Sequence, residues 1–302
     1  LRGAAAVYGK RQRHIVTSAV EHAIVRSTMD VLESQGFHVT RILPDADGVF
    51  HAQDFIDAVT EDTCLISMML VENETGRILP VGDVFRRLKK KFPKLITHCD
   101  AVQGFMKLPV RVNSLNADLL SISAHKIHGP KGVGALYIRK GVRLQPLTTG
   151  GKQENAIRPG TEAVPLIVGF GAAVQYMQPT IQERFTAVQA KREALLQILS
   201  EMEGITVNSI AEGSPYIVNF SVDGIRSETM LHFLEDEEIY VSSGSACSKG
   251  TRSGVLLAYG IPDDRADSAI RVSFSEETTD EDLTLLTTAI ARGQASLVHK
   301  KR

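Results

Sequence analysis

The stretch LLSISAHK, residues 119–126, decides the fold, because in it an apolar run ends directly before the polar group that closes with Lys126. A second apolar run, LITHCD at residues 95–100, ends in Asp100, 26 positions earlier. In an open α/β sheet, small ligands bind beside the carboxyl ends of the strands. The two stretches therefore predict a lysine and an acid at one edge of such a sheet.

Short apolar runs alternate with helical patterns through the first half of the chain. This alternation is typical of crossover units on a mainly parallel sheet with flanking helices, which is the α/β class. The predicted strands and helices come in chain order, with strands at residues 14–18, 39–43, 65–71, 96–100, 119–123 and 135–138, and helices at 21–35, 52–59 and 81–92.

The pattern changes after the glycines and prolines of residues 150–160. An apolar helix is predicted at residues 164–177, and residues 181–202 have helical spacing that leads into a second domain. Strand-like, helical and loop segments follow it, at residues 217–221, 228–235, 242–250 and 270–274. We therefore expect a large domain at residues 1–178 and a smaller α+β domain at 179–302.

Composition and charge exclude several classes of function. The 302 residues are 43% hydrophobic and 23% charged, with 34 Lys and Arg against 35 Asp and Glu. No net basic field argues for nucleic acid or a membrane surface, and no apolar stretch is long enough to span a bilayer. The three cysteines have neither paired nor metal-ligand spacing, so no metal site is predicted and we expect a reducing, cytoplasmic compartment.

The chain opens with Leu1, has a basic patch at residues 10–13, and contains no acid before Glu21. An organelle-targeting segment can have this composition, but a helix end followed by a strand is the favoured interpretation. A truncated or processed chain is expected.

Lys126 and Asp100 together have the chemistry that pyridoxal phosphate needs. A desolvated lysine can hold an aldehyde as an imine, and a carboxylate opposite the ring nitrogen keeps that nitrogen protonated. On the residues alone, two alternatives stay open. Lys126 could be a surface lysine that begins a turn, and Asp100 could simply end its strand.

Six runs, in order, carry a resemblance to a known family. They are TSAVEH (17–22), VENETG (71–76), DAVQG (100–104), SAHKIHGPKG (123–132), RPGT (158–161) and SSGSAC (242–247). Across essentially its whole length the sequence resembles the NifS-like cysteine desulfurases, which are fold type I pyridoxal-phosphate enzymes of the class V aminotransferase group.

The resemblance implies a role for each matching residue at the cofactor ring. Lys126 matches the Schiff-base lysine, and Asp100 the acid that pairs with the pyridinium nitrogen. Gln103 and Asn73 match the amides that reach the phenolic oxygen of the ring. His22 matches the histidine that stacks on the ring, where an imidazole can also move protons.

Other matches concern the phosphate and the substrate. Ser123 and His125 match phosphate-contacting positions, and both can donate hydrogen bonds. Thr161 matches a threonine that reaches the phosphate from the neighbouring subunit, which implies a homodimer. Arg271 matches the arginine that binds the substrate carboxylate, a task suited to a bidentate guanidinium, and Asn73 is expected to contact the substrate as well.

Cys247 decides which reaction the resemblance implies. Its loop is rich in Ser and Gly, which leave the backbone free to move, whereas Cys64 and Cys99 interrupt apolar runs and are expected in the core. By resemblance, Cys247 attacks the sulfur of L-cysteine, keeps it as a persulfide, releases alanine and passes the sulfur to an acceptor protein. Iron–sulfur cluster assembly, tRNA thiolation and selenium metabolism are all open as the pathway.

Three alternatives remain: a selenocysteine lyase, an aminotransferase of the same fold, and a catalytically silent scaffold. The scaffold is considered because the family has a Gly/Thr-rich phosphate turn upstream of the position of Leu1, with no counterpart in these residues. Such turns bind phosphate through backbone amides at a helix start, so weaker cofactor binding is expected. Glu72 and Pro159 also differ from the commonest family residues.

Overall fold

The computed structural model describes residues 1–108, 111–243 and 253–298, which form two compact units. The first unit comprises Leu1–Asp45, Val49–Val71 and Leu79–Ile181. The second comprises Ala46–Gly48, Glu72–Ile78 and Gln182–Arg302. Two short segments of the first half of the chain therefore belong to the second unit.

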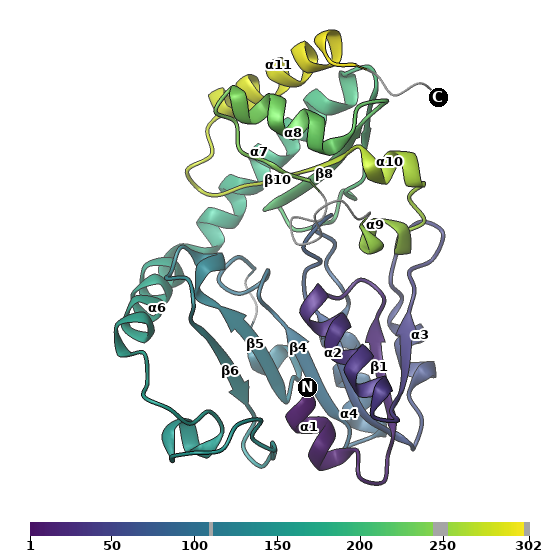
Figure 1. Ribbon diagram of the computed structural model, residues 1–302, viewed down its shortest axis with the longest axis vertical. Coiled ribbons are helices and arrows are strands. Elements are labelled where there is room, and N and C mark those ends of the chain that lie inside the picture. Colours follow the sequence, from purple (N-terminus) through teal and green to yellow (C-terminus); the bar gives the residue numbers. More distant parts are fainter. Residues whose placement is uncertain (109–110, 244–252, 299–302) are drawn as a thin grey trace. The chain divides into compact units, whose positions relative to one another are not determined.

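The first unit is built on a six-stranded sheet in the order β2-β1-β3-β4-β5-β6 (Figure 1). Five strands are parallel: β1 (His14–Ser18), β2 (His38–Ile42), β3 (Thr63–Met69), β4 (Ile96–Asp100) and β5 (Leu119–Ser123). The sixth, β6 (Gly134–Ile138), is antiparallel to β5. The predicted mainly parallel sheet is confirmed. Strand β3 ends two residues earlier than predicted, and the apolar Leu70 and Val71 that follow it are buried outside the strand.

The helices of the first unit are α1 (Arg2–Tyr8), α2 (Ala23–Ser34), α3 (Ala52–Ala58), α4 (Val81–Lys91), α5 (Val112–Leu115) and α6 (Val164–Met177). Of these, α2, α3, α4 and α6 lie where the sequence predicts helices, whereas α5 was not predicted. In α4 the buried residues Val81, Val84, Phe85 and Leu88 share one face, as an amphipathic helix requires. Lysines fill its last turn, where cations interact favourably with the helix dipole.

His98 is a polar residue in the interior of this sheet. One ring nitrogen lies 2.8 Å from the hydroxyl of Ser67 in β3, and the other lies 2.9 Å from that of Ser121 in β5. Burial lowers the pKa of His98 to about 3, so the imidazole is neutral. The ring therefore links three adjacent strands without placing a charge in the core.

The second unit contains an antiparallel sheet in the order β7-β8-β10-β9. Its strands are β7 (Ile205–Val207), β8 (Ile217–Val222), β9 (Ser242–Ser243) and β10 (Ala269–Ser273). The helices of this region are α7 (Ile181–Glu201), α8 (Ser227–Asp236), α9 (Gly254–Ala258), α10 (Asp263–Asp267) and α11 (Asp280–Ser296). This arrangement is a small α+β unit.

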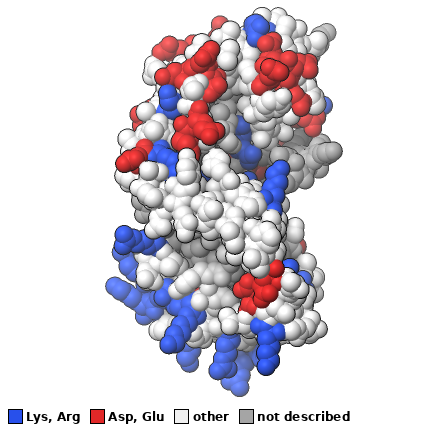
Figure 2. Space-filling view, turned by 90° about the vertical axis from the view of Figure 1, so that its left-hand side faces the viewer, with Lys and Arg blue, Asp and Glu red and all other residues white. Residues whose placement is uncertain are grey.

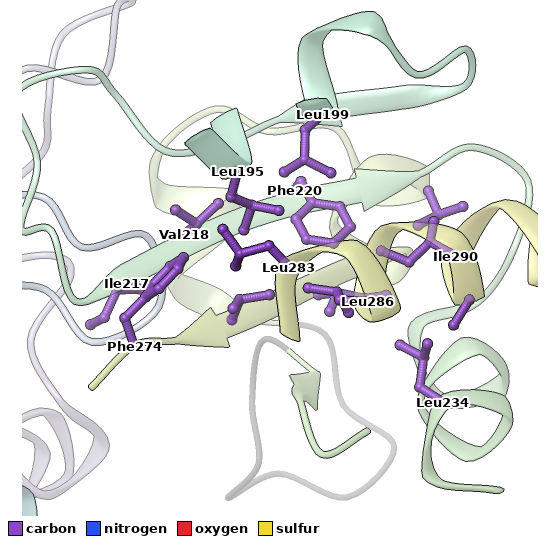
Figure 3. Packing of buried hydrophobic residues seen from close by; sticks show 14 of the residues in the cluster. Leu195, Leu199, Ile217, Val218, Phe220, Leu234, Phe274, Leu283, Leu286 and Ile290 are labelled. Atoms are coloured by element: carbon purple, nitrogen blue, oxygen red, sulfur yellow. The ribbon is translucent and has the colours of Figure 1, made fainter. Parts of the chain in front are cut away.

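Helix α11 was not among the predicted elements, although it completes the core of this unit. Its segment contains three threonines, which are weak helix formers. A capping box between Thr279 and Asp282 starts the helix. Leu283, Leu286 and Ile290 then pack into the cluster that surrounds Phe220 (Figure 3). Burial of these side chains outweighs the low helix propensity of the segment.

Among the described residues, no helix is both long and apolar enough to cross a membrane.

Replacing Phe220 by alanine tests this core. Phe220 is fully buried in β8, so the F220A variant should lose about 3–5 kcal/mol in the free energy of unfolding. Denaturant unfolding followed by circular dichroism measures the loss. Tyr240, which is 78% exposed, supplies the control: Y240A should change stability by less than about 0.5 kcal/mol. Equal effects of the two variants would contradict the assigned core.

Candidate active site

Asp100 is the last residue of β4 and lies at the carboxyl edge of the parallel sheet. It stands opposite Met69 of β3 and Ser121 of β5 in the strand register. The residue is buried, and its Oδ1 accepts a hydrogen bond from the backbone N–H of Val102 at 3.0 Å. Burial raises the pKa of Asp100, while the Val102 N–H and the nearby His22 favour the ionised form.

Lys126 lies in a short 3₁₀ turn, Ala124–Ile127, that follows β5 directly. The turn ends at His128 in a left-handed conformation, so the chain reverses immediately after the lysine. The side chain of Lys126 is half-buried. Beside it, the hydroxyl of Ser123 lies 2.7 Å from a ring nitrogen of the exposed His125.

His22 connects these two strand ends. It caps the start of α2, where its Nδ1 accepts the N–H of Ile24 at 3.3 Å. Burial lowers the pKa of His22, the Asp100 carboxylate raises it, and the Lys126 ammonium lowers it again. Because both groups act on its charge, Asp100 and Lys126 each lie within electrostatic reach of His22. The structure thus brings three sequence-predicted residues together at the carboxyl edge of the sheet.

Two further predicted residues of the first unit lie in loops. Gln103 is half-buried in the turn after β4, and its Oε1 accepts a hydrogen bond from the Lys107 ammonium at 3.5 Å. Thr161 is exposed in the loop before α6. It lines a surface hollow of about 520 Å³, formed by residues 148–151, 153 and 158–161.

Asn73 and Arg271 come together in the second unit. Arg271, in β10, donates from Nη1 to the backbone carbonyl of Asn73 at 3.0 Å and from Nη2 to the hydroxyl of Ser242 at 3.2 Å. Two buried polar atoms here, Asn73 Oδ1 and Arg271 Nε, have no hydrogen-bond partner among the described residues. A donor and an acceptor are therefore available to a ligand.

Two buried acids, Glu72 and Glu21, were not identified as functional candidates from the sequence, although each is next to a candidate residue. Glu72 is fully buried and accepts hydrogen bonds from the backbone N–H groups of Glu74 and Thr75, which shapes the turn that carries Asn73. Burial raises the pKa of Glu72, and the nearby Arg271 lowers it. The other acid is Glu21, next to His22. In the sequence, each of these acids is marked only by its position inside a motif, Glu21 in TSAVEH and Glu72 in VENETG.

The cysteines separate into two groups. Cys64 and Cys99 are free thiols with at most 1% exposure, which confirms their expected place in the core. Burial raises the pKa of Cys64 to about 11 and also raises the pKa of Cys99, so both remain protonated at neutral pH. Cys247, the predicted nucleophile, lies outside the described residues.

Nearly the whole chain is similar in sequence to proteins of a known family. The family model for aminotransferase class-V matches residues 2–286. The chain belongs to the class-V aminotransferase family. "Cysteine desulfurase IscS" from Clostridium botulinum (strain Kyoto / Type A2) is 37% identical over 289 residues, which are 94% of this chain and 72% of that protein. The "Cysteine desulfurase, mitochondrial" of Saccharomyces cerevisiae is 37% identical over 96% of this chain and 59% of its own length.

Solved structures agree with this membership. A structure described as "NIFS-LIKE PROTEIN" superimposes with a TM-score of 0.91 at 37% identity, and the match covers 98% of this chain and 78% of that one. A second, "SspA in complex with cysteine", has a TM-score of 0.78 at 33% identity over 92% of this chain and 78% of its own. The predicted resemblance and the fold type I architecture are confirmed, and the chain is a homologue of cysteine desulfurases.

The pKa of His22 tests the proximity of the three residues. Asp100→Asn should lower the pKa of His22 further, because the carboxylate supports the protonated ring. Lys126→Met should raise it, because the ammonium opposes protonation. Histidine side-chain NMR titration measures both shifts, with the signal assigned through a His22→Asn variant. The ring signals of His51, which pairs with Asp45 on the surface, should have the same chemical shifts in both variants. An unmoved His22 would disprove the cluster.

Proposed function

We propose that this protein is a pyridoxal-phosphate-dependent cysteine desulfurase, which converts L-cysteine to L-alanine and retains the sulfur as a persulfide. The observation that carries the proposal is the cluster of Lys126, Asp100 and His22 at the carboxyl edge of the sheet, in a chain homologous to cysteine desulfurases over 94% of its length. An amine, a buried acid and an aromatic base are the groups that this chemistry requires.

The residues of the first unit suit pyridoxal phosphate. Lys126 supplies the amine for the aldehyde, and Asp100, buried and bonded to the Val102 N–H, supplies a carboxylate for the ring nitrogen. Ser123 and His125 supply donors for the phosphate, and Gln103 an amide for the phenolic oxygen. When bound, the cofactor would supply a ring that accepts the electrons of a carbanion formed on the substrate.

His22 and Lys126 are the proposed proton carriers. Burial lowers the pKa of His22, the Asp100 carboxylate raises it and the Lys126 ammonium lowers it again, with a net shift that favours the neutral imidazole. Its Nδ1 accepts the N–H of Ile24, so the proton of the neutral ring is on Nε2, which is the nitrogen that would donate a proton in the active site. The amine of Lys126 would be a second group that can exchange a proton with the substrate.

Arg271 and Asn73 are the proposed substrate residues. Arg271 is held by the Asn73 carbonyl and by Ser242, and its buried Nε has no partner among the described residues. A substrate carboxylate would satisfy this donor in the geometry that a guanidinium favours. The partnerless Asn73 Oδ1 beside it can accept a hydrogen bond from a ligand.

Cys247 is the proposed nucleophile. Its thiolate attacks the sulfur of L-cysteine, so the substrate C–S bond breaks as a new S–S bond forms. The electron pair of the broken bond goes to the substrate β-carbon, which takes up a proton and becomes the methyl group of alanine. An acceptor protein then receives the terminal sulfur from the Cys247 persulfide, in a cytoplasmic, reducing setting.

A homodimer is part of the proposal. Helix α6 exposes apolar side chains, including Val164 (58% exposed), Val168 (64%) and Tyr176 (72%). Figure 2 shows few charged groups in the middle of this face. An exposed apolar helix face is typical of an interface. The hollow that contains Thr161 opens in the loop before this helix, as expected if Thr161 serves the phosphate site of a second copy.

Borohydride fixation tests the cofactor assignment. Purified protein incubated with pyridoxal phosphate and then reduced should gain the mass of one reduced cofactor on the peptide that contains Lys126. The K126A variant should gain none there, because it lacks the amine, whereas K131A should react as the wild type does. Intact-mass and peptide-mass spectrometry measure the addition. A wild-type protein that stays colourless with added cofactor would favour the scaffold alternative.

Alanine release tests the reaction. Cys247→Ser should lose nearly all alanine release from L-cysteine, because a hydroxyl does not form the persulfide. Cys64→Ser is the control; its thiol is buried, so activity per folded molecule should change little. Near-wild-type alanine release by the C247S variant would point to an aminotransferase. Turnover of selenocysteine with negligible turnover of cysteine would point to a selenocysteine lyase.

A further inference from the structure

Glu21 is a buried acid next to the cluster of Lys126, Asp100 and His22, and the proposed reaction gives it no role. It lies between the end of β1 and the start of α2, directly before His22, and its side chain is fully buried. Its Oε1 accepts hydrogen bonds from the Ser18 hydroxyl at 2.6 Å and from the Met69 backbone N–H at 2.8 Å. Glu21 therefore ties the ends of β1 and β3 together.

The same hydrogen bonds bring Glu21 close to Asp100. Met69 stands opposite Asp100 where β3 pairs with β4, so the side chain that holds Met69 ends beside the second acid. The Asp100 carboxylate acts on Glu21 and raises its pKa. Two buried acids therefore lie within electrostatic reach of each other near the carboxyl edge of the sheet.

The surroundings of the two acids are unequal. The second oxygen of Glu21, Oε2, is buried with no hydrogen-bond partner among the described residues, and no cation contributes to its charge balance. Asp100 is 8% exposed and accepts the Val102 N–H, whereas Glu21 is 0% exposed. Burial raises the pKa of Glu21 to about 8. Where two neighbouring acids cannot both ionise, the more completely buried one keeps the proton.

We propose that Glu21 is a neutral positioning residue: it holds the strand ends as a protonated carboxylic acid, so that Asp100 stays the single negative charge available to the cofactor nitrogen. Cys99 of β4 is a further titratable group near Glu21, and burial keeps its thiol protonated. The role toward the nitrogen rests on the proposed function, whereas the protonated state of Glu21 belongs to the protein alone.

Replacing Glu21 by glutamine is the decisive test. One amide oxygen can accept both hydrogen bonds that Oε1 accepts, and the amide nitrogen takes the place of the protonated oxygen. Infrared spectra of the cofactor-free protein at pH 7 should show the C=O band of a protonated carboxyl that is missing in E21Q. Absorbance titration should give a dissociation constant for pyridoxal phosphate within about twofold of the wild type.

Two results would overturn the inference. They are a protonated-carboxyl band unchanged in E21Q, or binding of pyridoxal phosphate weakened tenfold or more in a folded E21Q protein. Either would mean that Glu21 does not act as a neutral acid. A wild type that binds no pyridoxal phosphate would instead overturn the proposed function, and the infrared comparison alone would then decide whether Glu21 is protonated.

Asp118→Asn is the matched control. Asp118 is also a buried acid of the first unit, but it forms ion pairs with Lys89 and Arg139. It is therefore ionised, and D118N should leave the protonated-carboxyl band intact while lowering the melting temperature. E21Q, which removes no charge, should melt within a few degrees of the wild type.

Discussion

The parallel pairing of β1, β3, β4 and β5 is the constraint on which the candidate active site depends. Because these strands run in one direction, each delivers the residue that follows it to the same edge of the sheet. Asp100 ends β4, and the turn after β5 presents Lys126. The neutral ring of His98 links β3, β4 and β5 from inside, so their ends are kept in register without a buried charge.

Differences in burial give the ionisable groups at this edge of the sheet different protonation states. Asp100 is buried beside the Val102 N–H, and a protonated His22 would favour its carboxylate further. Glu21 is buried more completely and no described cation offsets its charge, so the neutral form is favoured there. His22 is pushed toward its neutral form by burial and by Lys126. Similar side chains thus acquire different protonation states because their solvation differs.

In the second unit, the candidate residues come from two segments that are far apart in the sequence. The segment Glu72–Ile78 leaves the chain of the first unit and packs with the second, where Asn73 accepts a hydrogen bond from Arg271 of β10. The turn around Asn73 depends on the buried Glu72, whose carboxylate accepts two backbone N–H groups. Glu72 therefore shapes the turn of a proposed substrate residue, and Arg271, the other proposed substrate residue, favours the ionised form of Glu72.

The alternating strands and helices, the mainly parallel sheet and the candidate residues Lys126, Asp100 and His22 could all be predicted from the amino-acid sequence. Apolar periodicity indicates the local backbone conformation and its buried face, and the candidate residues stand at the ends of the predicted strands. That α11 is a helix follows from its contacts in the folded core, which outweigh the low helix propensity of its threonines. The position of Glu21 beside Asp100 was likewise decided only by the tertiary structure, because desolvation and contacts between distant strands are not local properties of the chain.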